Sequence, residues 1–266
     1  MDIGFENKMF QMFDTGFLIS PRGDRLTTDE IDILERFPDV STVQITGLDQ
    51  QGFEHFIGKY GKQLRVINFF KNKLVQDWSA LGELTKLERI SWFHNQRIEK
   101  LWDMSGNSFL ELIDLSDFTR LKDLSGIEKA PALEWFRIGD SIWDKTVIKS
   151  LECFRGTEVR RLDFSGKDIE DKDMSFLAEM PRLEIFNFPA NLFTTEQIAW
   201  IDGNYPQIIG TAIAPYVTYN YDGQKICVTG KRKPSFALEG NEKRLKKCVD
   251  NYTKLVEKYK GEPFPM

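Results

Sequence analysis

Histidine is scarce in this chain, which limits the chemistry that its side chains can perform. The 266 residues include only His55 and His94, too few for a histidine metal site. His55 falls in a segment with helical spacing, where we expect it to face solvent. His94 follows an expected strand, a position from which it is able to contact a partner or act as a base. No serine or cysteine is placed to complete a nucleophilic pair with it.

The cysteines and the known catalytic motifs also give no sign of a reaction centre. Cys153, Cys227 and Cys248 are widely spaced and form no CxxC pair, so we expect neither a disulfide framework nor a zinc finger. HExxH, GxSxG, GxGxxG and DxDxDG are all missing from the sequence, and the glycine before Lys231 lacks the flanking residues of a phosphate loop. We therefore predict no catalytic residue, no metal and no cofactor, and a reduced, cytoplasmic setting.

Composition and charge are those of an ordinary globular chain. Hydrophobic residues make up 41% and charged residues 29%, and the formal net charge is −5, values that support a sizeable core and do not indicate disorder. The first ten residues carry no basic region followed by an apolar run, and no apolar run reaches the length of a bilayer span. We expect neither a secretory signal nor a membrane segment.

A repeat with a period of 23 to 26 residues runs through most of the chain. Its template, L-x-x-L-x-L-x-x-N-x-L, is matched at Leu64, Ile67, Phe69, Asn72 and Leu74. Further copies begin at Val40, Leu87, Leu110, Leu133, Val159, Leu183 and Ile208. In several copies a proline lies two residues before the first apolar position: Pro38, Pro131, Pro181 and Pro206. Because the two markers stay in phase, each copy is expected to form one structural unit.

The repeats resemble those of the leucine-rich-repeat family, with bacterial-type repeats of about 23–26 residues, over roughly residues 26 to 214. The resemblance implies an α/β solenoid, with a curved parallel sheet on the concave side and helices and turns on the convex side. Aromatic residues often replace leucine, and the convex segments vary in length. The asparagine position holds Asn72, Asn95 and Asn191, but Phe118, Ser141 and Lys167 elsewhere. These substitutions weaken the expectation of a regular asparagine ladder.

Helix signals are clear in some of the convex segments. Residues 27–30 and 194–197 have the pattern of a helix N-cap followed by acidic or amide residues. Residues 53–60 have helical spacing of apolar residues. Residues 101–110 contain Gly106 and Asn107, so we expect a turn there.

Both ends of a solenoid need caps, because each exposes apolar surface. We expect residues 17–19 to form a strand that closes the N-terminal end. After Pro215, alternating residues on both sides of Asp222–Gly223 predict a hairpin, and residues 242–260 predict a helix with one apolar face. The expected organisation is an N-terminal cap over 1–26, the solenoid over 27–214, and a hairpin and basic amphipathic helix as a cap over 215–266.

Positive charge is concentrated in that C-terminal segment. Residues 225–262 contain eleven Lys and Arg against five Asp and Glu. Such a segment is able to bind nucleic acid or an anionic surface, here through Arg232, Lys233, Lys246 and Lys247. The alternative, which we favour, is a capping helix whose lysines face water.

Strand geometry predicts which side chains point to the concave face. The third, fifth and seventh positions of each repeat point outward, one per strand, about 4.8 Å apart across the sheet. We expect an apolar patch there, open to solvent, formed by Val66, Phe70 and Phe93 and extended by Leu112 and Trp135. Aromatic anchors with arginine nearby are typical of protein-binding hot spots.

A ladder of alternating charge is expected beside this patch. It consists of Asp114, Arg137 and Asp163, with Arg89 and Arg161 nearby. Two alternatives remain open: the charges pair with each other and only stabilise the sheet, or a loop or residues 1–15 cover the phenylalanines. We predict a non-catalytic protein–protein interaction module that binds a protein partner on the concave face, with no cofactor and no membrane. Binding of nucleic acid or an anionic surface through 225–262 is the second hypothesis.

Overall fold

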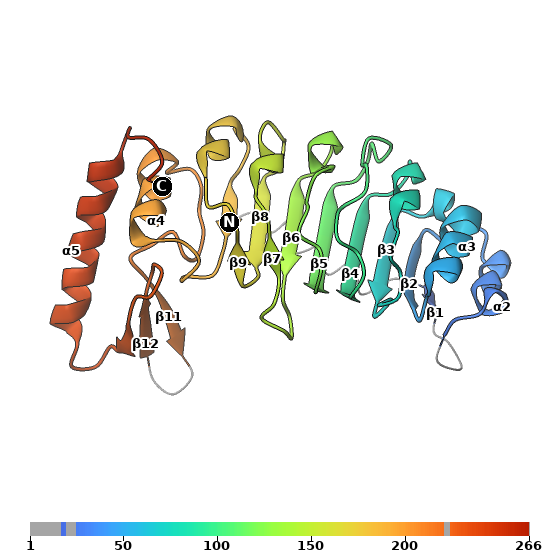
Figure 1. Ribbon diagram of the computed structural model, residues 1–266, viewed down its shortest axis with the longest axis horizontal. Helices are drawn as coiled ribbons and strands as arrows, with labels where there is room; N and C mark the ends of the chain where they lie inside the picture. Colours follow the sequence, from blue (N-terminus) through green and yellow to red (C-terminus); the bar gives the residue numbers. More distant parts are fainter. Residues whose placement is uncertain (1–16, 20–24, 221–223, 266) are drawn as a thin grey trace.

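The computed structural model describes residues 17–19, 25–220 and 224–265, and in them the chain has an α/β fold with one large parallel sheet. Eight strands lie side by side in chain order (Figure 1), and the sheet is open rather than closed. They are β1 (Phe17–Ile19), β2 (Thr42–Thr46), β3 (Val66–Phe70), β4 (Arg89–Asn95), β5 (Leu112–Phe118), β6 (Trp135–Gly139), β8 (Arg161–Ser165) and β10 (Ile185–Asn187). All neighbouring pairs are parallel, which confirms the strands predicted from the repeat.

The core forms because equivalent positions of successive repeats lie next to each other. Phe69 pairs in register with Trp92, Trp92 with Leu115, and Leu115 with Ile138. All four side chains are buried, and the rings of Phe69 and Trp92 stack with their centroids 4.2 Å apart. We call these four residues the inward row; they belong to the core between the sheet and the segments that connect the strands.

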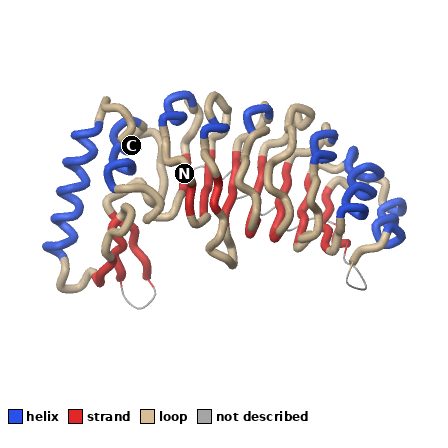
Figure 2. Tube along the Cα trace, viewed as in Figure 1, coloured by secondary structure: helices blue, strands red, loops and turns tan. Residues whose placement is uncertain are grey.

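The connecting segments carry short helices, which lie together along one side of the row of strands (Figure 2). The α-helices among them are α2 (Thr28–Ile31), α3 (Gln50–Tyr60) and α4 (Thr195–Asn204). The 3-10 helices are η1 (Asp32–Arg36), η2 (Gly61–Gln63), η3 (Ser79–Glu83), η4 (Ile127–Lys129), η5 (Glu152–Phe154) and η6 (Ser175–Glu179). Capping boxes with Thr27 and Thr194 begin α2 and α4 as predicted. Residues 101–110 contain no helix, also as predicted.

Asparagine side chains join the first repeats. The Asn72 side chain donates to the Ile45 carbonyl at 2.9 Å and accepts from the Leu48 amide at 2.8 Å. Asn95 also donates to the preceding repeat, to the Asn72 and Val75 carbonyls at 3.1 and 2.9 Å, but it accepts from the Arg97 and Ile98 amides of its own loop. Asn191 is exposed, so it does not extend this ladder. The ladder therefore ends where Phe118 occupies the asparagine position, as the irregular sequence pattern indicates.

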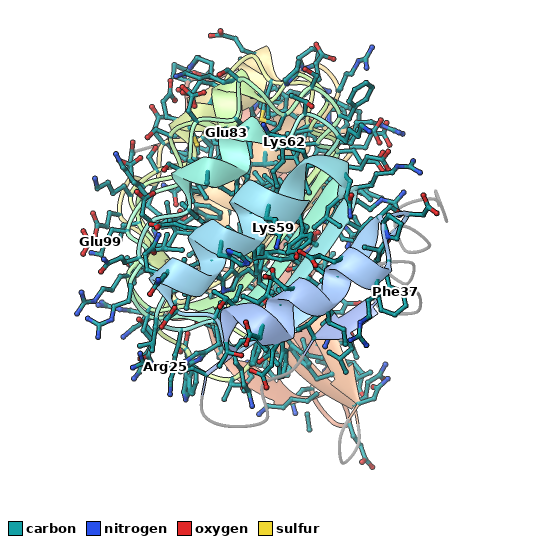
Figure 3. The ribbon with its side chains drawn as sticks, turned by 90° about the vertical axis from the view of Figure 1, so that its right-hand side faces the viewer. Arg25, Phe37, Lys59, Lys62, Glu83 and Glu99 are labelled. Carbon is teal, nitrogen blue, oxygen red and sulfur yellow. The ribbon has the colours of Figure 1, made fainter. Side chains whose placement is uncertain are left out.

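A polar cluster joins α2, η1 and α3 at the end of the molecule shown in Figure 3. His55 Nε2 lies 2.7 Å from Asp32 Oδ1, and the Tyr60 hydroxyl donates to the same oxygen at 2.6 Å. Lys59 lies between the helices and pairs with Asp32 at 3.1 Å and Glu35 at 2.6 Å. These bonds hold the pKa of Asp32 down at about 2, with the Tyr60 hydroxyl as the largest cause. His55 was expected to face solvent; its side chain is half-buried instead, because its ring reaches Asp32 in the preceding segment.

The C-terminal region is built from a small antiparallel sheet and one long helix. Strand β11 (Tyr216–Asn220) pairs with β12 (Gln224–Val228), which confirms the predicted hairpin, and β12 pairs with β13 (Ser235–Ala237). The predicted turn at 222–223 lies outside the described residues. Helix α5 (Glu242–Tyr259) packs beside α4, with Tyr252 in the core (Figure 1). None of the described helices is long and apolar enough to cross a membrane.

Candidate functional site

The face of the sheet away from the connecting helices, here called the open face, carries a continuous row of polar side chains. Strands β2, β3, β4, β5, β6, β8 and β10 of the large sheet contribute one residue each, and the parallel register places these residues next to each other. This polar row consists of Gln44, Asn68, Ser91, Asp114, Arg137, Asp163 and Asn187. The row exists because successive side chains of a strand alternate between the two faces, so one position per repeat recurs on the same line.

Hydrogen bonds satisfy the polar row at both of its ends. The Asn68 amide donates to Gln44 at 3.4 Å. At the other end, Asp163 accepts from Asn187 at 2.7 Å, from the Trp135 indole at 2.6 Å and from Arg161 Nε at 2.7 Å. Both carboxylate oxygens of Asp163 are therefore occupied.

Hydrogen bonding is incomplete in the middle of the polar row. Asp114 Oδ2 accepts from Arg137 Nη1 at 3.3 Å, but Asp114 Oδ1 and the neighbouring Ser91 hydroxyl have no hydrogen-bond partner although both are buried. Burial raises the pKa of Asp114 above its usual value, and the positive charge of Arg137 opposes that rise. Buried polar atoms without partners are uncommon in folded proteins, so a pair on adjacent strands needs an explanation.

A pocket of about 310 Å³ opens at this unsatisfied step of the polar row. Polar groups from the row, among them Ser91, Asp114 and Arg137, form one part of its lining. Phe70 and Phe93 form an aromatic part. The pocket therefore combines a carboxylate, a hydroxyl and two aromatic rings within a small volume.

Exposed aromatic side chains continue from the pocket to the nearby loop. Phe70 and Phe93 stack with centroids 5.2 Å apart, as predicted from their positions on adjacent strands. Phe93 contacts the His94 ring, which lies 4.7 Å from the Trp143 ring. Phe70 is 38% exposed, Trp143 37% and the neighbouring Ile142 64%. We call these five residues the aromatic patch.

The loop that carries Ile142 and Trp143 is held by one buried carboxylate. Asp117 Oδ1 accepts hydrogen bonds from the amides of residues 141, 142 and 143 at 3.0, 3.1 and 3.2 Å. Asp117 has a positive φ of 59°, and so have the equivalent residues of the two preceding repeats, Lys71 (57°) and His94 (66°). Positive φ is unfavourable for residues other than glycine and often accompanies functional sites.

Part of the predicted apolar patch is not open to solvent. Val66, Leu112 and Trp135 are 8%, 1% and 3% exposed and form a small buried cluster on the open face. The reason is that long neighbours lie over them: the Arg161 guanidinium sits 4.3 Å from the Trp135 ring centroid. Arginine stems readily cover apolar surface in this way. The expectation of solvent-exposed Val66, Leu112 and Trp135 was therefore wrong.

The arginines expected near the patch are engaged in ion pairs. Arg89 pairs with Glu111 at 2.8 Å, Arg137 with Asp114 at 3.3 Å and Arg161 with Asp163 at 2.7 Å. The charged ladder thus follows the alternative in which the charges pair with each other, except that Asp114 keeps one oxygen free of any hydrogen bond.

His94 and Cys153 lie in surroundings that favour their uncharged forms. Burial lowers the pKa of His94, and its Nε2 lies 3.2 Å from Gln96 Nε2. Burial raises the pKa of the Cys153 thiol to about 12, so it forms little thiolate. Within the described ranges, no group of three or more His, Cys, Asp or Glu is arranged to hold a metal ion.

Sequence reasoning missed Ser91, Ile142 and Trp143 as members of the site. Ser91 occupies the fifth position of its repeat, as the other members of the polar row do. Its hydroxyl stands out by lacking a hydrogen-bond partner, and no sequence pattern reveals this. Ile142 and Trp143 lie in the longest repeat, where the step from Leu133 to Val159 is 26 residues. Two large apolar residues in an extended loop are a signal that was available.

The basic C-terminal residues Arg232, Lys233, Lys246 and Lys247 face solvent. Lys246 and Lys247 are exposed on α5, while Tyr252 on the opposite side of the helix is buried. The Trp200 indole of α4 donates to the Glu262 carbonyl at 2.7 Å, which anchors the segment after α5. This arrangement agrees with a helix that covers the end of the core.

No protein-family model matches the chain, and no curated protein matches it.

Proposed function

We propose that this chain is a leucine-rich-repeat protein of the solenoid type, which binds another protein on the open face of its sheet and catalyses no reaction. The repeat period of 23 to 26 residues, the strands in chain order and the asparagine bonds between the first repeats support the family assignment. The three unbonded cysteines support a reducing, cytoplasmic location.

The observation that carries the binding proposal is the stacked Phe70–Phe93 pair beside the pocket, in which Phe70 is exposed and Phe93 half-buried. Aromatic rings held on rigid strands expose apolar area with little entropy left to lose on binding, which is the property of hot-spot residues. Trp143 and Ile142 enlarge this apolar surface. Contiguous apolar patches with a polar border are typical of protein-binding surfaces.

A partner-capture experiment with matched variants tests the proposal. The wild-type chain, Phe93→Asp and Phe109→Asp are each used for affinity capture from the native host. Phe109 is 63% exposed and precedes β5, at the other end of the strands from Phe93, so it controls for the loss of any exposed ring. We expect a protein that binds the wild type and Phe109→Asp but not Phe93→Asp, and that rebinds in purified form. Equal binding of that protein to Phe93→Asp would refute the proposed surface.

A further inference from the structure

The open face contains one arginine site that the chain satisfies by itself. The Arg161 guanidinium lies over the Trp135 ring, 4.3 Å from its centroid, and Arg161 Nε donates to Asp163 Oδ2 at 2.7 Å. An aromatic face and a carboxylate of the polar row thus hold a guanidinium between them. Stacking on a ring while donating to a carboxylate is a characteristic binding mode of arginine.

The pocket two strands away also brings a carboxylate, a hydroxyl and aromatic rings together, and the Arg137 side chain is part of its lining. Asp114 belongs to the same row as Asp163, and its Oδ1 and the Ser91 hydroxyl are the row's unpartnered acceptors. Phe70 and Phe93 provide the aromatic surface. Arg137 does not complete the site, because it donates to the other oxygen of Asp114, at 3.3 Å.

We infer that this pocket binds the guanidinium of an arginine side chain supplied by the protein partner, an inference that rests on the proposed protein-binding function. The guanidinium donates to Asp114 Oδ1 and to the Ser91 hydroxyl while it packs against the phenylalanine rings. Two acceptors on adjacent strands suit the planar fork of arginine better than the single ammonium of lysine.

Size and mobility fit a single inserted side chain. The volume of about 310 Å³ lies at the lower limit for small-molecule sites, which leaves room for a side chain rather than a cofactor. Asp114 Oδ1 and the Ser91 hydroxyl are nearly covered in the unbound chain. For a guanidinium to reach them, the Arg137 side chain, which is 34% exposed, has to move aside. Hydrogen bonds from the partner's arginine then remove the free-energy cost of leaving these two buried atoms without hydrogen bonds.

The experiment is an NMR titration of the backbone amides with N-acetyl-L-arginine amide at constant ionic strength. The matched probes are the lysine, norleucine and glutamate analogues. Wild-type protein should show saturable shifts centred on Ser91 and Asp114, with the arginine probe binding more tightly than each of the others. Asp114→Asn and Ser91→Ala should each weaken that binding by about fivefold or more, because the first removes the negative charge that attracts the guanidinium and the second removes one acceptor.

Control measurements keep the outcome decisive. Asp250→Asn removes the same charge from the exposed surface of α5 and should leave binding unchanged. Thermal melts show whether each variant is folded. The relative affinities of the four probes for the wild-type protein test the inference even if a variant does not fold. Equal binding of the arginine and lysine probes, or no shift at Ser91 and Asp114, overturns the inference. Partner capture with Phe93→Asp tests the general binding function separately, so the two failures are distinguishable.

Discussion

Asp114 and Arg137 face each other on adjacent strands, with Oδ2 and Nη1 3.3 Å apart, yet their pairing leaves the other Asp114 oxygen without a hydrogen bond. Asp114 is 6% exposed. A buried carboxylate with incomplete hydrogen bonding costs stability, because water no longer solvates the charge. In the folded chain this cost is tolerated at a step of the polar row that lines the pocket.

The first prediction concerns the stability cost of Asp114. Burial raises the pKa of Asp114 in the folded state above its unfolded value. The protonated carboxyl therefore favours folding below the unfolded pKa, and this contribution is lost as the pH rises through the folded pKa. We expect Asp114→Asn to raise the melting temperature at pH 7 and to have little effect near pH 3.5, about the usual pKa of aspartate.

Thermal denaturation at the two pH values measures this difference, with Asp250→Asn as the control for loss of a surface charge. A lower melting temperature of Asp114→Asn at pH 7 would mean that the ion pair with Arg137 outweighs the cost of burial.

The second prediction concerns Asp32 at the α2–α3 end. Hydrogen bonds, first of all from Tyr60, hold its pKa at about 2, below the ordinary 3.8. The stabilising contribution of the carboxylate is therefore present above the unfolded pKa and is lost as the pH falls through about 2. We expect Asp32→Asn to destabilise the protein at neutral pH, and Tyr60→Phe to raise the pKa of Asp32. Carboxyl NMR titration of the wild type and of Tyr60→Phe measures the change in the pKa of Asp32. An unchanged pKa in Tyr60→Phe would exclude the hydroxyl as the main cause of the low pKa.

The third prediction concerns the inward row of the core. Phe69→Ala and Trp92→Ala should each lower the free energy of unfolding by about 3–5 kcal/mol, since each leaves a large cavity in a packed interior. Denaturant titration measures the loss. Phe109→Ala, at an exposed ring, is the matched control and should cost less than about 1 kcal/mol. Losses of that small size at Phe69 and Trp92 would contradict their place in the core.

The fourth prediction concerns the loop that completes the aromatic patch. Asp117→Ala removes the acceptor of three amide bonds at residues 141–143. We expect hydrogen exchange of these amides to become faster, because their protection depends on those bonds. Exchange in the distant α4 helix reports whether the whole protein is destabilised. Unchanged exchange at 141–143 would show that other contacts hold Trp143 in place.

The last prediction separates protein binding from nucleic-acid binding. Phe70→Ala and Phe93→Ala should each weaken partner binding by about 2 kcal/mol, as expected for exposed hot-spot residues. Replacing Lys246 and Lys247 together with Glu should have little effect, and binding should depend weakly on salt. Binding to phosphate groups predicts the opposite order of effects and a steep salt dependence. Isothermal titration at two salt concentrations measures both.

Trp135 is excluded from this set of anchors by its burial. Its ring is 3% exposed and bonded to Asp163, so Trp135→Ala tests the packing of the sheet rather than partner contact. We expect its main effect to be on stability.

The amino-acid sequence by itself determined the strands, their order and the side of the sheet on which each residue lies. Residues alternate between the two faces of a strand, and the repeat brings equivalent positions together, so local rules were enough to align Phe69 with Trp92 and Phe70 with Phe93. The caps at Thr27 and Thr194 were readable for the same reason, because a helix start depends on a few adjacent residues.

Only the tertiary structure decided which outward side chains remain accessible and which polar groups lack partners. Trp135 and Phe93 both occupy outward positions, yet Arg161 lies over the first, whereas Phe93 stays half-buried beside the exposed Phe70. Asp163 and Asp114 likewise share one row, but only Asp163 has both oxygens bonded. Accessibility and hydrogen bonding depend on how long side chains from neighbouring strands and loops pack, and several of these contacts, such as that of Arg161 with Trp135, join residues more than twenty positions apart.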